Sequence, residues 1–94
     1  MLNRVCLAGR QVDDVELRAT KSGIVYTVFE VAVDRDFKER DGTCKTDTVT
    51  VAAYDKTADY IAKYGAKNRL LMIDGRLRVH STRVEVVADH INFG

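Results

Sequence analysis

Hydrophobic and polar side chains alternate with a period of two along most of this chain, a pattern typical of β-strands that bury one face. From Val25 to Val33, odd-numbered side chains lie on one face of the predicted strand and even-numbered ones on the other. Residues Thr46–Tyr54 alternate in the same way, and three further runs are rich in Val, Ile and Leu: Leu2–Ala8, Leu70–Val79 and Val84–Phe93. The pattern therefore predicts five strands.

One helix is predicted between the third and fourth of these runs. Ala58, Ile61 and Ala62 share one stripe, Asp55 is placed to cap the N-terminus, and Gly65 stands where a left-handed C-cap would end the helix. Five strands with a helix between the third and fourth is the order of an OB-fold, a five-stranded Greek-key barrel. We therefore expect an all-β fold with one short helix, and a single OB-fold domain over residues 1–94.

Glycines and turn residues fall where this arrangement needs them. Lys21–Gly23 is expected to reverse the chain before the second strand, and Asp41–Gly42 to form the tip of a charged loop over residues 34–45. Gly9 and Gly75 lie inside predicted strands, where glycine commonly marks a bulge or a sharp bend.

The composition is that of a folded protein, because 46% of the residues are hydrophobic and 31% are charged. No apolar run approaches the ~20 residues that cross a bilayer, so no membrane partner is expected. Fifteen basic and fourteen acidic residues give a formal net charge of +1, so a polyanion would have to bind a local patch. Met1–Arg4 carries no export signal, and Cys6 and Cys44 lie in unlike surroundings. We expect reduced thiols in the cytoplasm, with nucleoid association, or in an organelle of bacterial origin.

Residues with catalytic chemistry occur, but their spacing does not favour catalysis. His80 and His90 lie in the last predicted strands without a nearby nucleophile or metal-ligand spacing. Asp13–Asp14 lies in a predicted turn, where solvation explains both carboxylates. We therefore expect a binding protein rather than an enzyme, with no catalytic residue, metal or cofactor.

The predicted strand Thr46–Tyr54 offers a surface for binding. Its outer face carries Thr48, Thr50, Ala52 and Tyr54, a flat and mixed surface on which an unstacked base could lie.

Two groups of cations accompany this surface. Phe37 lies between Arg35 and Lys38 in the charged loop, a combination suited to base stacking and phosphate neutralisation. Acidic residues alternate with these cations, so a solubilising hairpin explains the loop equally well. The second group, Arg76, Arg78 and Arg83, brackets the final predicted hairpin. The cations expected to contact phosphates are Arg35, Lys38, Lys56, Arg76, Arg78 and Arg83. In the alternative interpretation, these cations form ion pairs across neighbouring strands with Asp34, Asp36, Asp74 and Glu85.

Several segments resemble bacterial single-stranded DNA-binding proteins in collinear order. Leu2–Arg10 resembles the opening strand of that family, and Val15–Arg18 followed by Ser22–Gly23 resembles the segment that comes next. Three further segments resemble later strands of the family: Phe29–Val33, Ile73–Leu77 and Glu85–Asp89. The resemblance covers essentially the whole chain, which makes it more specific than any single motif.

The resemblance implies an OB-fold that assembles as a dimer of dimers and wraps single-stranded DNA without sequence preference. On matching positions, Phe37 and Tyr54 stand where the family keeps stacking aromatics. Thr48 occupies the position of a family tryptophan, and the hairpin around Ser81–Thr82 is shortened and has no aromatic. At ~1–3 kcal/mol per stacked base, these two losses predict weaker binding than in an aromatic-rich member.

The opening strand is apolar on both faces, and such an edge would be an aggregation hazard if left bare. We expect it to pair with a second copy in a homodimer or homotetramer, through Leu2, Val5, Cys6 and Leu7.

Family members that serve replication usually carry a long acidic-ended tail that recruits partners, whereas this sequence stops after Asn92–Gly94. Two interpretations stay open, a truncated binding core and a short relative similar to primosomal accessory proteins. We expect single-stranded DNA binding in replication, recombination or repair, with replication or primosome proteins as further partners. The residues do not distinguish DNA from RNA. The alternative function is a protein-interaction module that kept the fold with weak or lost DNA affinity.

Overall fold

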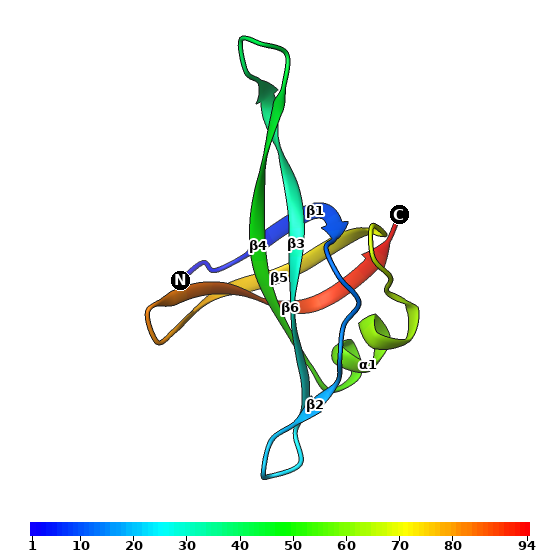
Figure 1. Ribbon diagram of the computed structural model, residues 1–94. Coiled ribbons are helices and arrows are strands. Elements are labelled where there is room, and N and C mark those ends of the chain that lie inside the picture. The colour runs from blue at the N-terminus through cyan, green and yellow to red at the C-terminus, as the bar shows by residue number, and fades with distance from the viewer.

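Six strands and one helix make up the computed structural model, which describes residues 1–94 (Figure 1). In chain order they are β1 (Val5–Gln11), β2 (Arg18–Ala19), β3 (Val25–Lys38), β4 (Cys44–Tyr54), α1 (Asp55–Tyr64), β5 (Leu70–His80) and β6 (Arg83–Phe93). The strands hydrogen-bond in the order β1-β5-β6-β4-β3-β2, and β1 also pairs with β3. Only β4 and β6 run parallel. The sheet thus closes into a barrel of five long strands, with the two-residue β2 beside β3.

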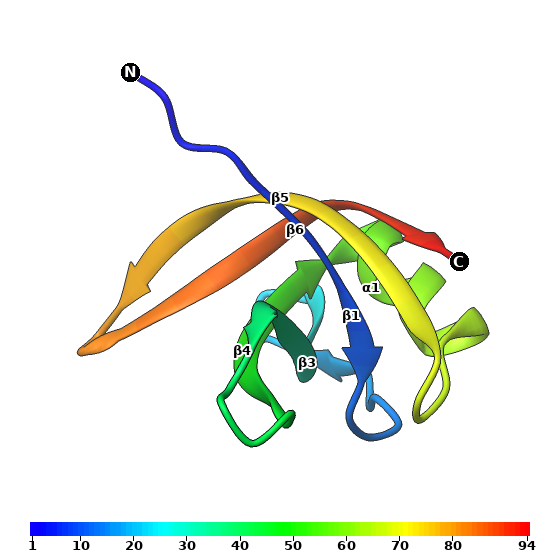
Figure 2. The same cartoon turned by 90° about the horizontal axis from the view of Figure 1, so that it is seen from above.

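This arrangement confirms the predicted OB-fold. The helix lies between the third and fourth long strands, which are β4 and β5 once the short β2 is counted. Figure 2 shows α1 on one side of the barrel and the tip of the β5–β6 hairpin projecting on the other. The structure contains no helix with the length and apolar character needed to cross a membrane.

Alternate side chains of the long strands fill the barrel, and burial of their apolar surface supplies the main stabilising free energy. The core consists of Phe29, Val31, Val51, Ala53, Ala58, Ile61, Leu71, Ile73, Val86, Ala88 and Ile91. Ala58 and Ile61 are the buried residues of α1, so the predicted helical stripe does face the barrel.

The first predicted strand was placed too early in the chain. It runs from Val5 to Gln11 rather than from Leu2 to Ala8. Before Val5, the Asn3 side chain accepts a hydrogen bond from the Leu77 amide and donates one to the Leu77 carbonyl. A side chain, rather than the backbone ladder, therefore fastens this segment to β5.

The charged segment predicted as a loop over residues 34–45 is mostly a paired hairpin. Strand β3 continues to Lys38 and β4 begins at Cys44, although the register shifts between Asp34 and Lys38. Polar side chains hold the two strands together, as when the Thr46 hydroxyl donates to the Asp34 carboxylate at 2.9 Å. Gly42, with φ +87°, forms the predicted tip.

The predicted N-cap is wrong, and the predicted C-cap is correct in position but not in conformation. The N-cap is Tyr54, without a side-chain cap, and Asp55 is the first helical residue with a left-handed φ of 51°. Gly65 has a φ of −74°, so its role is not conformational. A Cβ at this position would lie 2.5 Å from the Ile61 carbonyl oxygen and 2.5 Å from the Gln11 Oε1 atom. Close packing of the helix end against β1 therefore explains Gly65.

The two strand glycines sit at bends of the barrel. The β5–β6 register shifts between Asp74 and Gly75, as predicted for a bulge. A Cβ on Gly9 would lie 2.5 Å from the Ala32 carbonyl oxygen, at the place where β1 closes onto β3. A Cβ on Gly75 would lie 2.1 Å from the Val87 carbonyl oxygen, so β5 and β6 approach closely there.

We predict that Gly75→Ala lowers the melting temperature more than Gly23→Ala does. Gly23 has open space around it and only its φ of +90° opposes a side chain, so we expect a loss of about 1 kcal/mol. At Gly75 the added methyl would force two paired strands apart, at about 3 kcal/mol. Thermal denaturation followed by circular dichroism measures both, and equal melting temperatures would contradict the close approach.

Candidate nucleic-acid interface

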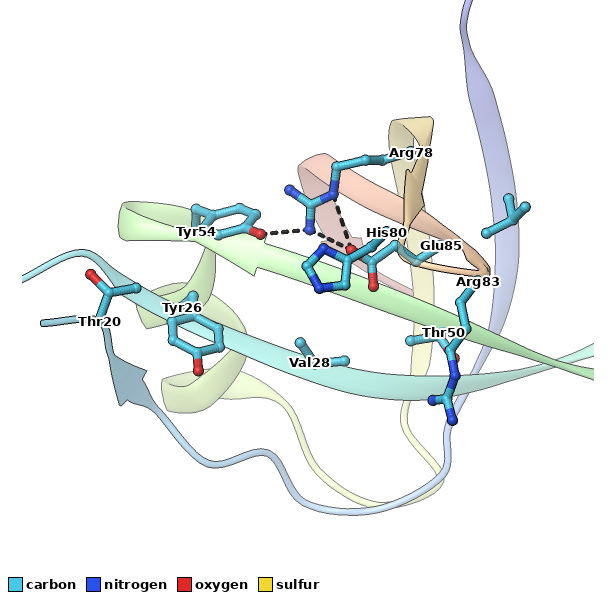
Figure 3. A pocket seen from close by; sticks show the side chains of 10 residues that line it. Thr20, Tyr26, Val28, Thr50, Tyr54, Arg78, His80, Arg83 and Glu85 are labelled. Carbon is cyan, nitrogen blue, oxygen red and sulfur yellow. Dashed lines mark hydrogen bonds and ion pairs between the residues drawn. The ribbon is translucent and has the colours of Figure 1, made fainter. Parts of the chain in front are cut away.

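A groove of about 740 Å³ opens on the outer face of β3 and β4, beside the β5–β6 hairpin (Figure 3). Its walls come from three places in the sequence. Thr20 precedes β3, Tyr54 ends β4, and Arg78 and Glu85 face each other across β5 and β6. The groove is therefore assembled only when β6 pairs with β4.

Two tyrosines form one end of the groove. Tyr54 is the last residue of β4, and Tyr26 lies directly opposite it on β3. Their ring centroids are 6.3 Å apart and the ring planes are tilted by 31°. Both side chains are half-buried, so each ring is held by the sheet and still lines the groove. Tyr26 was missed from the sequence, although period-two alternation places it on the same face of β3 as Val28, another lining residue.

An ion pair lies beside Tyr54. Arg78 Nε donates to Glu85 Oε1 at 3.0 Å, and Nη2 contacts the same oxygen. Nη2 also donates to the Tyr54 hydroxyl at 2.6 Å. The hydrogen bond to Glu85, followed by the one to Tyr54, raises the pKa of Arg78. Glu85 was named from the sequence only as a partner for a cation, and its place in the groove was missed.

The six predicted cations lie in four places. Arg78 and Arg83 line the groove. Lys56 is exposed beside a separate hollow between α1 and β6. Arg76 lies on the same face of β5 as Arg78, but it is paired with Asp89 of β6 and does not line the groove. The structure thus brings Tyr54, Arg78 and Arg83 together and leaves the other cations outside.

The β3–β4 hairpin carries the remaining predicted residues and stands clear of the barrel (Figure 1). Phe37 is 76% exposed, as a stacking side chain would have to be. Arg35 pairs with Asp47 at 2.9 Å, and this hydrogen bond holds the pKa of Asp47 below its ordinary value. Lys38 makes no ion pair, and Thr48 is exposed opposite Ala32.

Three of the six predicted cations therefore form ion pairs, as expected if they pair with acids across strands rather than contact phosphates. Two of the three acids differ from those predicted. Only Glu85 was a predicted partner. Asp74 instead binds Arg4 at 2.7 Å, because β1 lies beside β5. Lys38, Lys56 and Arg83 make no ion pair.

Strand β1 has one free edge. It pairs with β5 from Val5 to Arg10, but with β3 only at Arg10 and Gln11. Val5 and Leu7 are half-buried against the core, whereas Cys6 is exposed. Leu2 is 98% exposed beyond the strand. The predicted oligomer residues thus follow an unpaired strand edge and its apolar extension.

A closed five-stranded barrel with an aromatic and cationic groove over β3 and β4 defines the class of OB-fold binding proteins. The sequence profile of the Single-strand binding protein family matches residues 2–93, and the chain belongs to this family. The family consists of binding proteins rather than enzymes, in agreement with the prediction from the sequence.

Named relatives match nearly the whole chain. It is 37% identical over 102 residues to single-stranded DNA-binding protein 1 of Staphylococcus aureus, covering 99% of this chain and 65% of the relative. It is 32% identical to a single-stranded DNA-binding protein of Oceanobacillus iheyensis, covering 99% of this chain and 63% of that one. The chain therefore spans somewhat less than two thirds of the length of these relatives.

A solved structure supports the fold. A deletion mutant of the single-stranded DNA binding protein from Thermus aquaticus superimposes with a TM-score of 0.77 at 22% sequence identity. The match covers 98% of this chain and 50% of that one. The likeness extends over the barrel as a whole.

Proposed function

We propose that this protein binds single-stranded DNA without sequence preference, by base stacking and phosphate contacts. The groove carries the proposal, because it places two tyrosines next to cationic side chains in a chain of the Single-strand binding protein family. The names of the relatives support the same ligand. The binding surface offers aromatic faces, on which any base can stack.

Stacking and charge occupy different parts of this surface. Tyr54 and Tyr26 offer rings inside the groove, and Phe37 offers a third ring on the β3–β4 hairpin. Arg83 and Lys38 are free to neutralise phosphates near these rings. Arg35, Lys56, Arg76 and Thr48 would contact the strand where it leaves the groove.

The free edge of β1 is proposed to pair with a second copy of the chain, giving a homodimer or homotetramer. An unpaired row of backbone groups is a template for another strand. Exposed apolar side chains lie near it, with Leu2 at 98% and Leu77 at 48% exposure. Pairing would therefore satisfy backbone groups and cover apolar surface together.

The wider role is a proposal at the level of the family. A protein that coats single strands would act in replication, recombination or repair, in the cytoplasm at the nucleoid or in an organelle of bacterial origin. Replication or primosome proteins would be its further partners, and RNA a second possible ligand. The ion pairs of Arg35, Arg76 and Arg78 favour one rival function, an interaction module with weak DNA affinity.

Phe37→Ala should weaken binding to oligo-dT by about 1–3 kcal/mol and leave the melting temperature unchanged, because the ring is 76% exposed. Tyr54→Ala should cost a similar amount, with a fall in melting temperature because its ring is half-buried. Fluorescence anisotropy measures the affinity. Tyr64→Ala, an exposed aromatic on α1, is the matched control and should bind as the unmodified protein does. Unaltered affinity in the Phe37 variant would remove Phe37 from the interface.

The salt dependence of oligo-dT binding measures how many cations meet phosphates. Each neutralised phosphate contributes a slope of about −0.7 in log K against log salt. The three unpaired cations alone predict about −2, and all six predict about −4. We expect a value between these limits. No measurable binding at low salt would refute the proposed function and favour the interaction module.

Light scattering at tens of micromolar should give the mass of two or four copies of the 10.6 kDa chain. Leu2→Asp should shift the protein towards smaller species, because a charge would replace an exposed apolar group beside the free edge. Leu17→Asp, at another exposed leucine, is the control. A mass of 10.6 kDa for the unmodified protein would exclude this assembly.

A further inference from the structure

Glu85 is the least exposed charged group of the groove. Its side chain is 10% exposed, against 37% for its partner Arg78. Burial of a carboxylate is unfavourable unless donors compensate for the lost water. Arg78 supplies that compensation through Nε and Nη2, which both reach Glu85 Oε1 (Figure 3). The cross-strand register favours this geometry, because Arg78 and Glu85 are directly opposed on β5 and β6.

The same guanidinium also holds Tyr54. Nη2 donates to the tyrosine hydroxyl at 2.6 Å, and the guanidinium carbon lies 5.2 Å from the ring centroid. Rotation about χ1 of tyrosine swings the whole ring between staggered wells, so backbone pairing alone does not fix where the ring lies. The hydroxyl is the atom that this rotation moves farthest, so its hydrogen bond to Arg78 holds the ring in place. Glu85 fixes Arg78, and Arg78 in turn fixes Tyr54.

The pairing also decides where charge is available in the groove. A phosphate that took Arg78 would leave Glu85 nearly buried beside a second anion, without its donor. Arg83, which is exposed and makes no ion pair, has no such cost. The groove therefore has a neutral floor at Arg78, Glu85 and Tyr54, and a cationic rim at Arg83.

We propose that Glu85 is a positioning residue, which acts through Arg78 to hold the Tyr54 ring for stacking and keeps phosphates off the groove floor. This inference rests on the proposed function, because it describes how the groove receives a single strand. It changes the role of Arg78 from a phosphate contact to a support for the ring.

Salt titrations of Arg78→Ala and Arg83→Ala separate the two roles. Arg83→Ala should make the slope of log K shallower by about 0.7. Arg78→Ala should weaken oligo-dT binding by about tenfold and leave the slope unchanged, because a stacking ring rather than a phosphate contact is lost. A slope that becomes shallower by about 0.7 in Arg78→Ala would overturn the inference and leave the proposed function intact.

Tyr54→Phe tests the hydroxyl while keeping the ring, so this variant should fold. We expect a two- to tenfold loss of affinity, about the value of one hydrogen bond, with no change in slope. In the Tyr54→Phe background, Arg78→Ala should cost much less than in the unmodified protein. Full affinity in Tyr54→Phe, or additive losses in the double variant, would overturn the inference.

Glu85→Gln gives a readout that a purely structural role would not move. The amide keeps the shape and removes the charge, so Arg78 becomes available to phosphates and the slope should steepen by about 0.7. A lower melting temperature with an unchanged slope would assign Glu85 to stability alone and overturn the inference. Failure of the unmodified protein to bind oligo-dT would instead refute the proposed function, and the inference with it.

Discussion

The register shift at Gly75 is the constraint on which the rest of the binding surface depends. Asp74 pairs with His90 and Gly75 pairs with Ala88, so Asp89 is an extra residue in β6. Ile91 faces the core on one side of this bulge, and Val86 and Ala88 face it on the other. Odd-numbered residues of β6 therefore face the core after the bulge, and even-numbered residues face it before the bulge. Glu85, an odd-numbered residue before the bulge, is turned outward into the groove. A glycine is needed opposite, because β6 approaches the β5 backbone too closely for a side chain.

Most of the fold could be predicted from the sequence because period-two alternation persists through every long strand. The places where prediction failed have local physical causes. Asp55 has the right chemistry for a cap, but Tyr54 is still in the extended conformation of β4 when the helix begins, and Asp55 already belongs to the helix. Gly65 is the C-cap as predicted, but its φ of −74° is not left-handed, and its lack of a side chain serves packing against Gln11. Charged residues such as Arg35 and Asp47 interrupt the hydrophobic alternation, so the pattern predicts a loop where two strands in fact pair through these side chains.

The candidate site was only partly predictable, because a local irregularity in β6 decides which residues face the groove. Tyr54 and Arg78 could be found as an aromatic and a cation on outer faces of predicted strands. Simple alternation over Val84–Phe93 would place Glu85 on the same face as Ile91, which is buried in the core. A one-residue bulge reverses that assignment, and Gly75 marks the bend on β5 without showing that the extra residue lies in β6 at Asp89. Glu85 could therefore be named as an acid near Arg78, but not as a member of the groove.

The bulge and the ion pair together show how a chain with almost no net charge would present the proposed site for a polyanion. Three of the six predicted phosphate contacts are neutralised by acids on neighbouring strands, and the other three, Lys38, Lys56 and Arg83, lie at separate points of the surface. Attraction to phosphate is then local and weak over any one region, and the groove must contribute through shape and aromatic faces. The ion pair between Arg78 and Glu85 fits this arrangement, in which aromatic faces lie in the groove and free cations lie outside its floor. In the proposed binding mode, the ion pair fixes a ring without adding a charge that would draw the DNA backbone inward, to the place where the bases are proposed to stack.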